Sequence, residues 1–114
     1  MPTSTALTVI MMDPPPEQEE DWNNWYTNVH SPGRFECGFL GFRRFKILGG
    51  QPQVDTQQSG LAKYLAIMEL PNTAVLTSPE YDAVTQRWVA LPDDSFEHIT
   101  MGLDKFARGV FKLI

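Results

Sequence analysis

One histidine, His30, follows a run of aromatic side chains whose spacing fits a single face of a helix. Trp22, Tyr26 and His30 recur at intervals of four, with Trp25 on a neighbouring position. Residues four apart lie on the same side of an α-helix, so the imidazole and the aromatic rings would share one face. An imidazole has an ordinary pKa of about 6.5, which suits it to exchange protons near neutral pH. The pattern predicts an apolar pocket with His30 as its acid or base.

Other side chains could complete such a site. The phenol of Tyr64 or Tyr26 can donate a hydrogen bond to an oxygen that gains negative charge, and we predict Tyr64 as a catalytic residue beside His30. The residues predicted to contact a substrate are Trp22, Trp25, Tyr26, Phe42, Arg43 and Met68. The alternative is that the aromatic residues and the methionine are ordinary core, and that His30 only stabilises the negative end of a helix dipole.

Two adjacent arginines, Arg43 and Arg44, lie in a predicted strand. Neighbouring strand residues point to opposite faces, so only one of the two can face the helices, and the sequence leaves open which one. An inward arginine needs an anion, either Glu69 or a carboxylate of a ligand. The alternative is a salt bridge at an edge or a dimer interface.

Metal and cofactor sites are not indicated. The two histidines show no His-x-x-His or Glu-x-x-His spacing, and the chain has one cysteine, Cys37, with no recognisable activating neighbour. No glycine-rich phosphate loop or dinucleotide fingerprint is present, so we expect neither a metal nor a cofactor.

Composition narrows the class of protein. The 114 residues are 42% apolar, which indicates one globular domain over residues 1–114. Nine basic and fourteen acidic side chains give a net charge of −5, so nucleic acid is a poor candidate partner. No apolar stretch approaches the ~20 residues of a membrane span, and no export signal is recognised. A lone cysteine suits a reducing compartment, and we expect a cytoplasmic protein.

The first half of the chain predicts a strand, a helix and a second strand. The apolar residues 6–12 end at Asp13 and three prolines, and a helix over 17–30 then ends at Ser31-Pro32-Gly33. Residues 38–48 are typical of a strand, and the polar segment 51–60 of an exposed loop that could fold over a pocket mouth.

The second half predicts a strand, a divided helix and a last strand. Residues 63–70 alternate as a strand, and the next helical region restarts where Ser78 can cap a helix that begins at Pro79. Residues 95–104 fit a short helix or a loop, and 105–114 a strand.

The predicted order is β-α-β-β-α-β. This is an α+β, ferredoxin-like arrangement, an antiparallel sheet with both helices on one face. Because strand 63–70 is apolar on both sides, the bare sheet face is expected to meet a second copy of the chain, which makes a homodimer.

Four blocks of sequence resemble the EthD-like branch of the dimeric α/β-barrel superfamily. The blocks are Trp22-x-x-Trp25-Tyr26-x-x-x-His30-x-Pro32, Gly38-Phe39-x-x-x-Arg43-Arg44-Phe45, Lys63-Tyr64-Leu65-Ala66-x-x-Glu69-Leu70 and Leu76-Thr77-Ser78-Pro79-x-Tyr81. The resemblance implies ferredoxin-like protomers that pair through their sheets, with small pockets between each sheet and its helices. One departure is Cys37, where the family commonly has a proline before the glycine of the second strand.

The superfamily includes cofactor-free polyketide cyclases, lactone isomerases and monooxygenases, and proteins without known activity. The sequence and this resemblance together lead us to expect an enzyme that performs cyclisation, isomerisation or dehydration/lyase chemistry on a small aromatic, polyketide-like or lactone metabolite, with His30 moving the proton. The alternatives are a non-catalytic ligand-binding or accessory dimer, and a cofactor-free monooxygenase.

Overall fold

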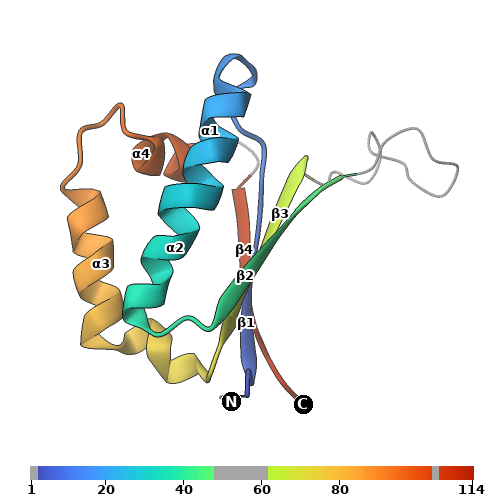
Figure 1. Ribbon diagram of the computed structural model, residues 1–114, viewed down its shortest axis with the longest axis vertical. Coiled ribbons are helices and arrows are strands. Elements are labelled where there is room, and N and C mark those ends of the chain that lie inside the picture. The colour runs from blue at the N-terminus through green and yellow to red at the C-terminus, as the bar shows by residue number, and fades with distance from the viewer. Residues whose placement is uncertain (1–2, 48–61, 104–105) are drawn as a thin grey trace, which may run out of the picture.

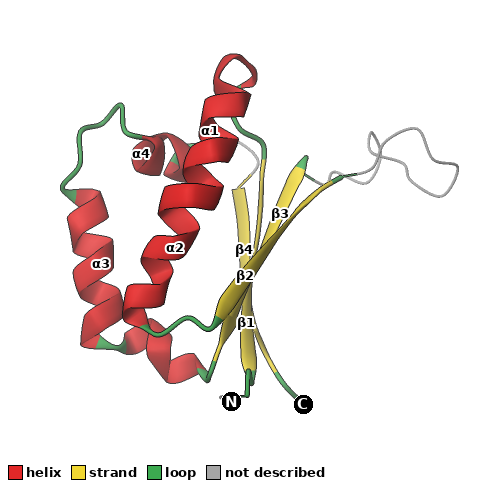
Figure 2. Cartoon of the chain, in the orientation of Figure 1, coloured by secondary structure: helices red, strands yellow, loops and turns green. Residues whose placement is uncertain are grey.

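The chain folds into one antiparallel sheet with helices on one of its faces (Figures 1 and 2). The computed structural model describes residues 3–47, 62–103 and 106–114. The strands are β1 (Ala6–Met12), β2 (Gly41–Lys46), β3 (Tyr64–Leu70) and β4 (Phe106–Lys112), in the spatial order β2-β3-β1-β4. The helical segments are η1 (Pro16–Gln18), α1 (Glu19–Trp25), η2 (Tyr26–His30), α2 (Ser31–Gly33), η3 (Arg34–Cys37), η4 (Thr73–Thr77), α3 (Pro79–Val89) and α4 (Phe96–Met101). This confirms the predicted ferredoxin-like α+β fold.

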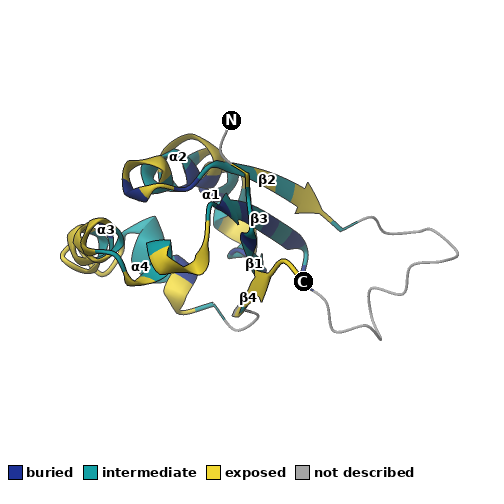
Figure 3. Ribbon diagram, turned by 90° about the horizontal axis from the view of Figure 1, so that it is seen from below, coloured by how far each residue is buried: buried dark blue, intermediate teal, exposed yellow. Residues whose placement is uncertain are grey.

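The two faces of the sheet differ because side chains alternate along each strand. In β3 the even-numbered residues, from Tyr64 to Leu70, are buried, and the odd-numbered ones are partly exposed. The register places Thr8 of β1 beside Met68 on one side and Val110 of β4 on the other. The even-numbered positions of β1 and β3 therefore form the face under the helices, and Figure 3 shows buried positions along β3, whereas β4 is largely exposed.

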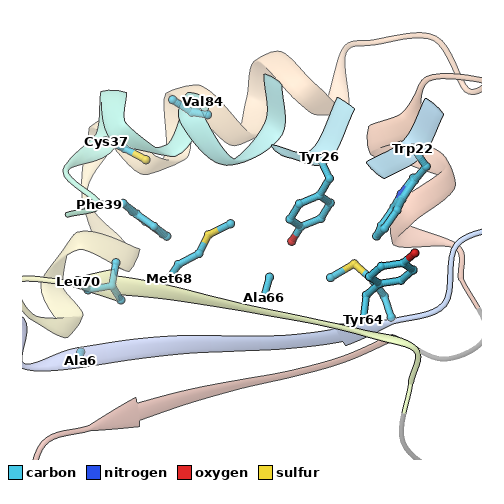
Figure 4. Close-up of a cluster of buried hydrophobic side chains, with 11 residues drawn as sticks. Ala6, Trp22, Tyr26, Cys37, Phe39, Tyr64, Ala66, Met68, Leu70 and Val84 are labelled. Atoms are coloured by element: carbon cyan, nitrogen blue, oxygen red, sulfur yellow. The ribbon is translucent and has the colours of Figure 1, made fainter. Parts of the chain in front are cut away.

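Aromatic side chains from the first helical run form the centre of the core. Trp22 and Tyr26 are almost fully buried, and their rings lie 5.1 Å apart between centroids. Figure 4 shows both rings directed towards the side chains of β3, where the Tyr64 ring lies 5.7 Å from that of Trp22. Burial of such large rings removes the most apolar area per residue and fixes the first helical run against the sheet.

The end of the first helix differs from the prediction. The chain stays helical beyond Ser31-Pro32-Gly33 and ends only at Cys37, through the π-helical turn η2, the short helix α2 and the 3₁₀ turn η3. Pro32 has no N–H, and its ring would clash with a carbonyl one turn earlier in a regular α-helix. The wider π turn just before it accommodates the proline without ending the helix, so His30 lies inside the helical run.

A glycine ends this run. Gly38 has a φ of 98°, which favours a residue without a Cβ. Its N–H donates to the carbonyl of Phe35 at 3.2 Å, and the N–H of Phe39 donates to that of Arg34 at 3.4 Å. These are the two bonds of a Schellman motif. Because Gly38 and Phe39 take part in this motif, β2 begins later than predicted.

The remaining elements follow the prediction closely. The second helical region is divided as expected, with Ser78 accepting a hydrogen bond from the N–H of Tyr81 at the start of α3. Of the two forms open for residues 95–104, the short helix is found, and Ser95 caps it. The predicted loop over 51–60 lies outside the described residues. No helix in the described part of the chain has the length and hydropathy needed to span a membrane.

Candidate functional site

A cavity of about 260 Å³ lies between the sheet and the helices. Its walls come from the strands β1, β3 and β4, from the first helical run, and from α3 and α4. The lining residues are Ile10, Tyr26, His30, Arg34, Phe39, Met68, Tyr81, Thr85, Trp88, Val89, Glu97, Thr100, Met101 and Arg108. A mostly apolar cavity with a few polar groups is the usual form of a small-molecule site.

The imidazole of His30 is held among three aromatic rings in the cavity wall. Its centroid lies 4.6 Å from the rings of Tyr26 and Trp88 and 5.0 Å from that of Trp25. The ring nitrogen Nδ1 is buried and has no hydrogen-bond partner.

The surroundings of His30 favour its neutral form. Burial of the imidazole, followed by repulsion from the Arg34 and Arg44 guanidinium groups, lowers the pKa of His30 to about 3. The ring is therefore uncharged at neutral pH. It can accept a proton or a hydrogen bond, but the ligand-free protein disfavours the imidazolium.

Arg34 lies one helical turn beyond His30 on the same wall. Its guanidinium carbon lies 4.2 Å from the ring centroid of Trp88 and 4.5 Å from that of Tyr81, which is the spacing of cation–π contacts. Its Nη1 is buried without an acceptor. Burial lowers the pKa of Arg34, while the Tyr81 phenol and the Cys37 thiol oppose that shift.

The cavity lining holds more basic than acidic side chains. Arg108 from β4 also lines it and donates to the Tyr81 hydroxyl at 3.1 Å. Burial raises the pKa of Tyr26 to about 12, and the charges of Arg44, Arg34 and Arg108 act in the opposite direction by favouring a phenolate. The charges of three arginines therefore influence the pKa of Tyr26, which lies beside His30.

One carboxylate, Glu97 from α4, lines the same cavity. Its Oε1 accepts a hydrogen bond from the Trp25 indole nitrogen at 3.2 Å. Among the described residues of the lining, Glu97 is the one acidic side chain, beside the basic Arg34 and Arg108.

The structure brings three of the predicted site residues to the cavity. His30, Tyr26 and Met68 line it, and the Trp25 ring lies 5.0 Å from the His30 ring between centroids. Trp22 lies beyond the cavity in the core, where its indole nitrogen donates to the Thr100 hydroxyl at 2.9 Å.

The other predicted residues lie elsewhere. Phe42 packs near Phe35, with ring centroids 5.9 Å apart. Arg43 is exposed and lies on the opposite face of the sheet from the cavity. The hydroxyl of Tyr64 donates to Glu19 at 2.9 Å and accepts from Asn23 at 2.9 Å.

Arg44, not Arg43, faces the helices, but it does not line the cavity. It donates to the side-chain oxygens of Asn23 at 2.8 Å and of Thr27 at 2.9 Å. Glu69, one of the two anions considered for the inward arginine, lies on the outer face because it is an odd-numbered residue of β3. Arg44 therefore donates to uncharged side-chain oxygens, those of Asn23 in α1 and Thr27 in η2, and not to a carboxylate.

Sequence reasoning missed Arg34 and Arg108. Arg34 continues the four-residue spacing of Tyr26 and His30, and the predicted helix end at Pro32 hides this signal. Arg108 lies on the helix-facing side of β4, opposite Ile10, and the alternation of that strand could have indicated it.

Among the residues that the structure describes, no three or more histidine, cysteine, aspartate or glutamate side chains are grouped to hold a metal ion. Cys37 is buried, and burial raises the pKa of its thiol, which disfavours a reactive thiolate.

The fold is that of the EthD-like α+β proteins. In particular, the chain is similar to the crystal structure of an ethyl tert-butyl ether D (EthD) family protein from Bacillus halodurans, with a TM-score of 0.60 and 13% sequence identity. The likeness covers 96% of this chain and 99% of that one, and it confirms at the level of the fold the resemblance carried by the four sequence blocks. No family model and no curated protein matches the sequence.

Proposed function

We propose that the cavity binds a compact aromatic, polyketide-like or lactone metabolite, and that His30 exchanges a proton with it. The reaction would be a cyclisation, an isomerisation or a dehydration or related lyase step, carried out without a cofactor. The observation that supports this proposal best is the position of His30, with a ring in the wall of a 260 Å³ cavity and a buried nitrogen that no protein group satisfies.

Because the pKa of His30 is low, the residue enters the proposed reaction as a neutral base. A neutral imidazole takes a proton from a C–H or O–H group of the substrate, and negative charge then develops on the substrate oxygen. That charge offsets the repulsion that Arg34 and Arg44 exert on the imidazolium, so the pKa of His30 rises within the complex. The burial of the site strengthens each of these interactions.

Tyr26 is the phenol that we propose to stabilise the developing oxyanion. It lines the cavity and its ring lies 4.6 Å from that of His30 between centroids. The hydroxyl of Tyr64 is already engaged by Glu19 and Asn23. Tyr64 therefore positions the helix that contains Tyr26 and does not itself line the cavity.

Hydrogen–deuterium exchange tests this proposal on several classes of candidate substrate at once. Aromatic ketones, β-keto esters and unsaturated lactones are incubated with the protein in D₂O, and NMR measures the rate at which carbon-bound protons are replaced. We expect acceleration for at least one class, and a loss of about 10²–10⁴-fold in His30→Gln.

The second histidine offers a matched control. His98 of α4 does not line the cavity, and its Nε2 lies 3.1 Å from the carbonyl oxygen of Val89. His98→Gln should leave the exchange rate unchanged. Exchange in His30→Gln at the wild-type rate would rule out the proposed role of this residue.

A second candidate function is ligand binding without chemistry. It is favoured by the same pKa of about 3, because a ring that resists protonation can serve as a fixed hydrogen-bond partner. Saturable binding of a ligand whose protons never exchange would decide for this alternative.

We further propose that the protein acts as a homodimer that pairs through the outer face of the sheet. That face carries the partly exposed Leu7, Val9 and Ile67, and the residues Phe45 and Phe111 are 45% and 55% exposed. A large exposed apolar sheet face favours pairing with a second copy. Sedimentation should show a dimer, and Ile67→Lys should give a folded monomer; a monomeric wild-type protein would contradict the proposal.

A further inference from the structure

We infer that the cavity selects a planar, conjugated monoanion, with the anionic oxygens of a carboxylate or enolate paired to Arg34. This inference rests on the proposed function and names the class of ligand that the site takes. Three features of the cavity support it: the balance of charge, the missing acceptor and the flat aromatic walls.

The balance of charge comes from the side chains that line the cavity. Arg34 and Arg108 are positive, Glu97 is negative, and the lining thus carries an excess of one positive charge. Glu97 is hydrogen-bonded to the Trp25 indole. The net charge of the lining therefore favours a ligand that carries a negative charge.

The missing acceptor is at Arg34. Its Nη1 is buried with no hydrogen-bond partner, whereas a buried charged donor ordinarily finds one because leaving it unpaired is costly. The groups that stabilise its charge are the Tyr81 phenol and the Cys37 thiol, neither of which is a carboxylate. A ligand carboxylate supplies the acceptor that the protein does not provide.

The aromatic walls define the shape of the ligand. The guanidinium of Arg34 and the imidazole of His30 both lie against the Trp88 ring, at 4.2 Å and 4.6 Å from its centroid. A planar guanidinium prefers a carboxylate in its own plane, where two parallel hydrogen bonds form. A flat ligand can extend this pairing across the cavity to His30, and 260 Å³ accommodates a ring with short substituents.

The test uses matched acids and amides. Binding of benzoate and benzamide, and of 2-naphthoate and 2-naphthamide, is measured at pH 7 by ligand-observed NMR and calorimetry. The two members of each pair have nearly the same shape and differ in charge. We expect the acid of at least one pair to bind about tenfold or more tightly than its amide, which corresponds to about 1.4 kcal/mol.

Variants assign this preference to Arg34. In Arg34→Gln the acid and the amide should bind within about threefold of each other, a loss typical of a charged hydrogen bond. Arg87→Gln is the matched control, because Arg87 is an exposed arginine of α3 paired with Glu36 on the surface, and it should keep the wild-type ratio. Thermal unfolding establishes that both variants are folded.

Each outcome bears on a different claim. Equal binding of acids and amides to the wild-type cavity, or an acid preference that survives in Arg34→Gln, would overturn the inference and leave the proposed function standing. Failure of every acid and amide to perturb the His30 ring signals would also overturn the inference, whereas the proposed function falls only if His30-dependent proton exchange is absent.

Discussion

Two arginines, Arg44 and Arg34, lie against aromatic rings on the helix-covered side of the sheet, yet their surroundings differ. The guanidinium of Arg44 lies 4.6 Å from the Tyr26 ring and 5.2 Å from the Trp22 ring, and that of Arg34 lies 4.2 Å from Trp88. Both terminal nitrogens of Arg44 donate to side chains of the first helical run, and its buried Nε alone is unpaired. Arg34 borders a cavity, and its terminal Nη1 is buried without an acceptor.

The difference separates a structural cluster from a candidate binding site. Arg44 belongs to a network with Asn23, Tyr64 and Glu19, in which neighbouring polar groups bond to one another and join β2 and β3 to α1. Arg34 has comparable aromatic contacts and no comparable polar ones. A terminal guanidinium nitrogen that lacks an acceptor at the wall of a cavity therefore marks the place where a ligand is expected.

The largest expected effect is the pH dependence of stability. The pKa of His30 is about 3 in the folded protein and about 6.5 unfolded, so the unfolded chain binds this proton more tightly. The free energy of unfolding should fall as the pH drops from about 6.5 towards 3, by up to about 1.4 kcal/mol per pH unit. Denaturant titrations over this range measure the slope.

Variants show which residues cause the pH dependence of the free energy of unfolding. His30→Gln should remove it above pH 4.5, and the lowered pKa of Glu19 leaves a loss in the same direction only below that value. Arg34→Leu should raise the pKa of His30 in the folded protein more than Arg44→Leu does, since Arg34 has the larger of the two charge effects on His30. A wild-type slope that is unchanged in His30→Gln would contradict the assignment.

The second prediction compares the stability of variants at the two arginines. Arg44→Leu should destabilise the fold by about 2–3 kcal/mol, because it removes the charge-assisted hydrogen bonds to Asn23 and Thr27 and the contact of the guanidinium with the Tyr26 ring. Arg34→Leu should change the free energy of unfolding by less than about 0.5 kcal/mol or increase it, because a partly buried charge that has aromatic contacts but an unsatisfied Nη1 is replaced by an apolar group. Urea denaturation measures both variants, and equal losses of stability would show that the two arginines do not differ in role.

The smallest effect concerns the two tyrosines. Tyr64→Phe removes a hydroxyl that bonds to Glu19 and Asn23, and it should cost about 1–1.5 kcal/mol of stability. Tyr26→Phe should cost less than about 0.5 kcal/mol, since Tyr26 lines the cavity and its hydroxyl does not join that network. The same urea titrations apply, and a greater loss for Tyr26→Phe would place it in the structural cluster.

Much of the fold was predictable because its signals are local. The alternation of residues 63–70 and the proline stop after Met12 define β3 and β1, and the Ser78-Pro79 pair starts α3. These elements depend on the spacing of apolar residues and on caps, both of which can be identified in a single sequence.

The site was less predictable because it depends on contacts between distant segments. The spacing of Tyr26 and His30 indicated one wall, but no sequence signal marks the π turn that carries the helix past Pro32 and brings Arg34 to the cavity. The opposite wall comes from α3, α4 and β4, and their approach depends on tertiary packing. Alternation showed that one arginine must face inward, and only the register of β2 with β3 identifies Arg44.

The most direct test of the account is an NMR titration of the His30 ring, free and with a saturating conjugated acid such as 2-naphthoate. We expect a pKa of about 3 in the free protein, because the imidazole is buried beside Arg34, and a clear rise when the anion is bound. A free-protein pKa near 6.5, or a pKa that the bound acid does not move, would contradict the claim that His30 and Arg34 share one ligand cavity.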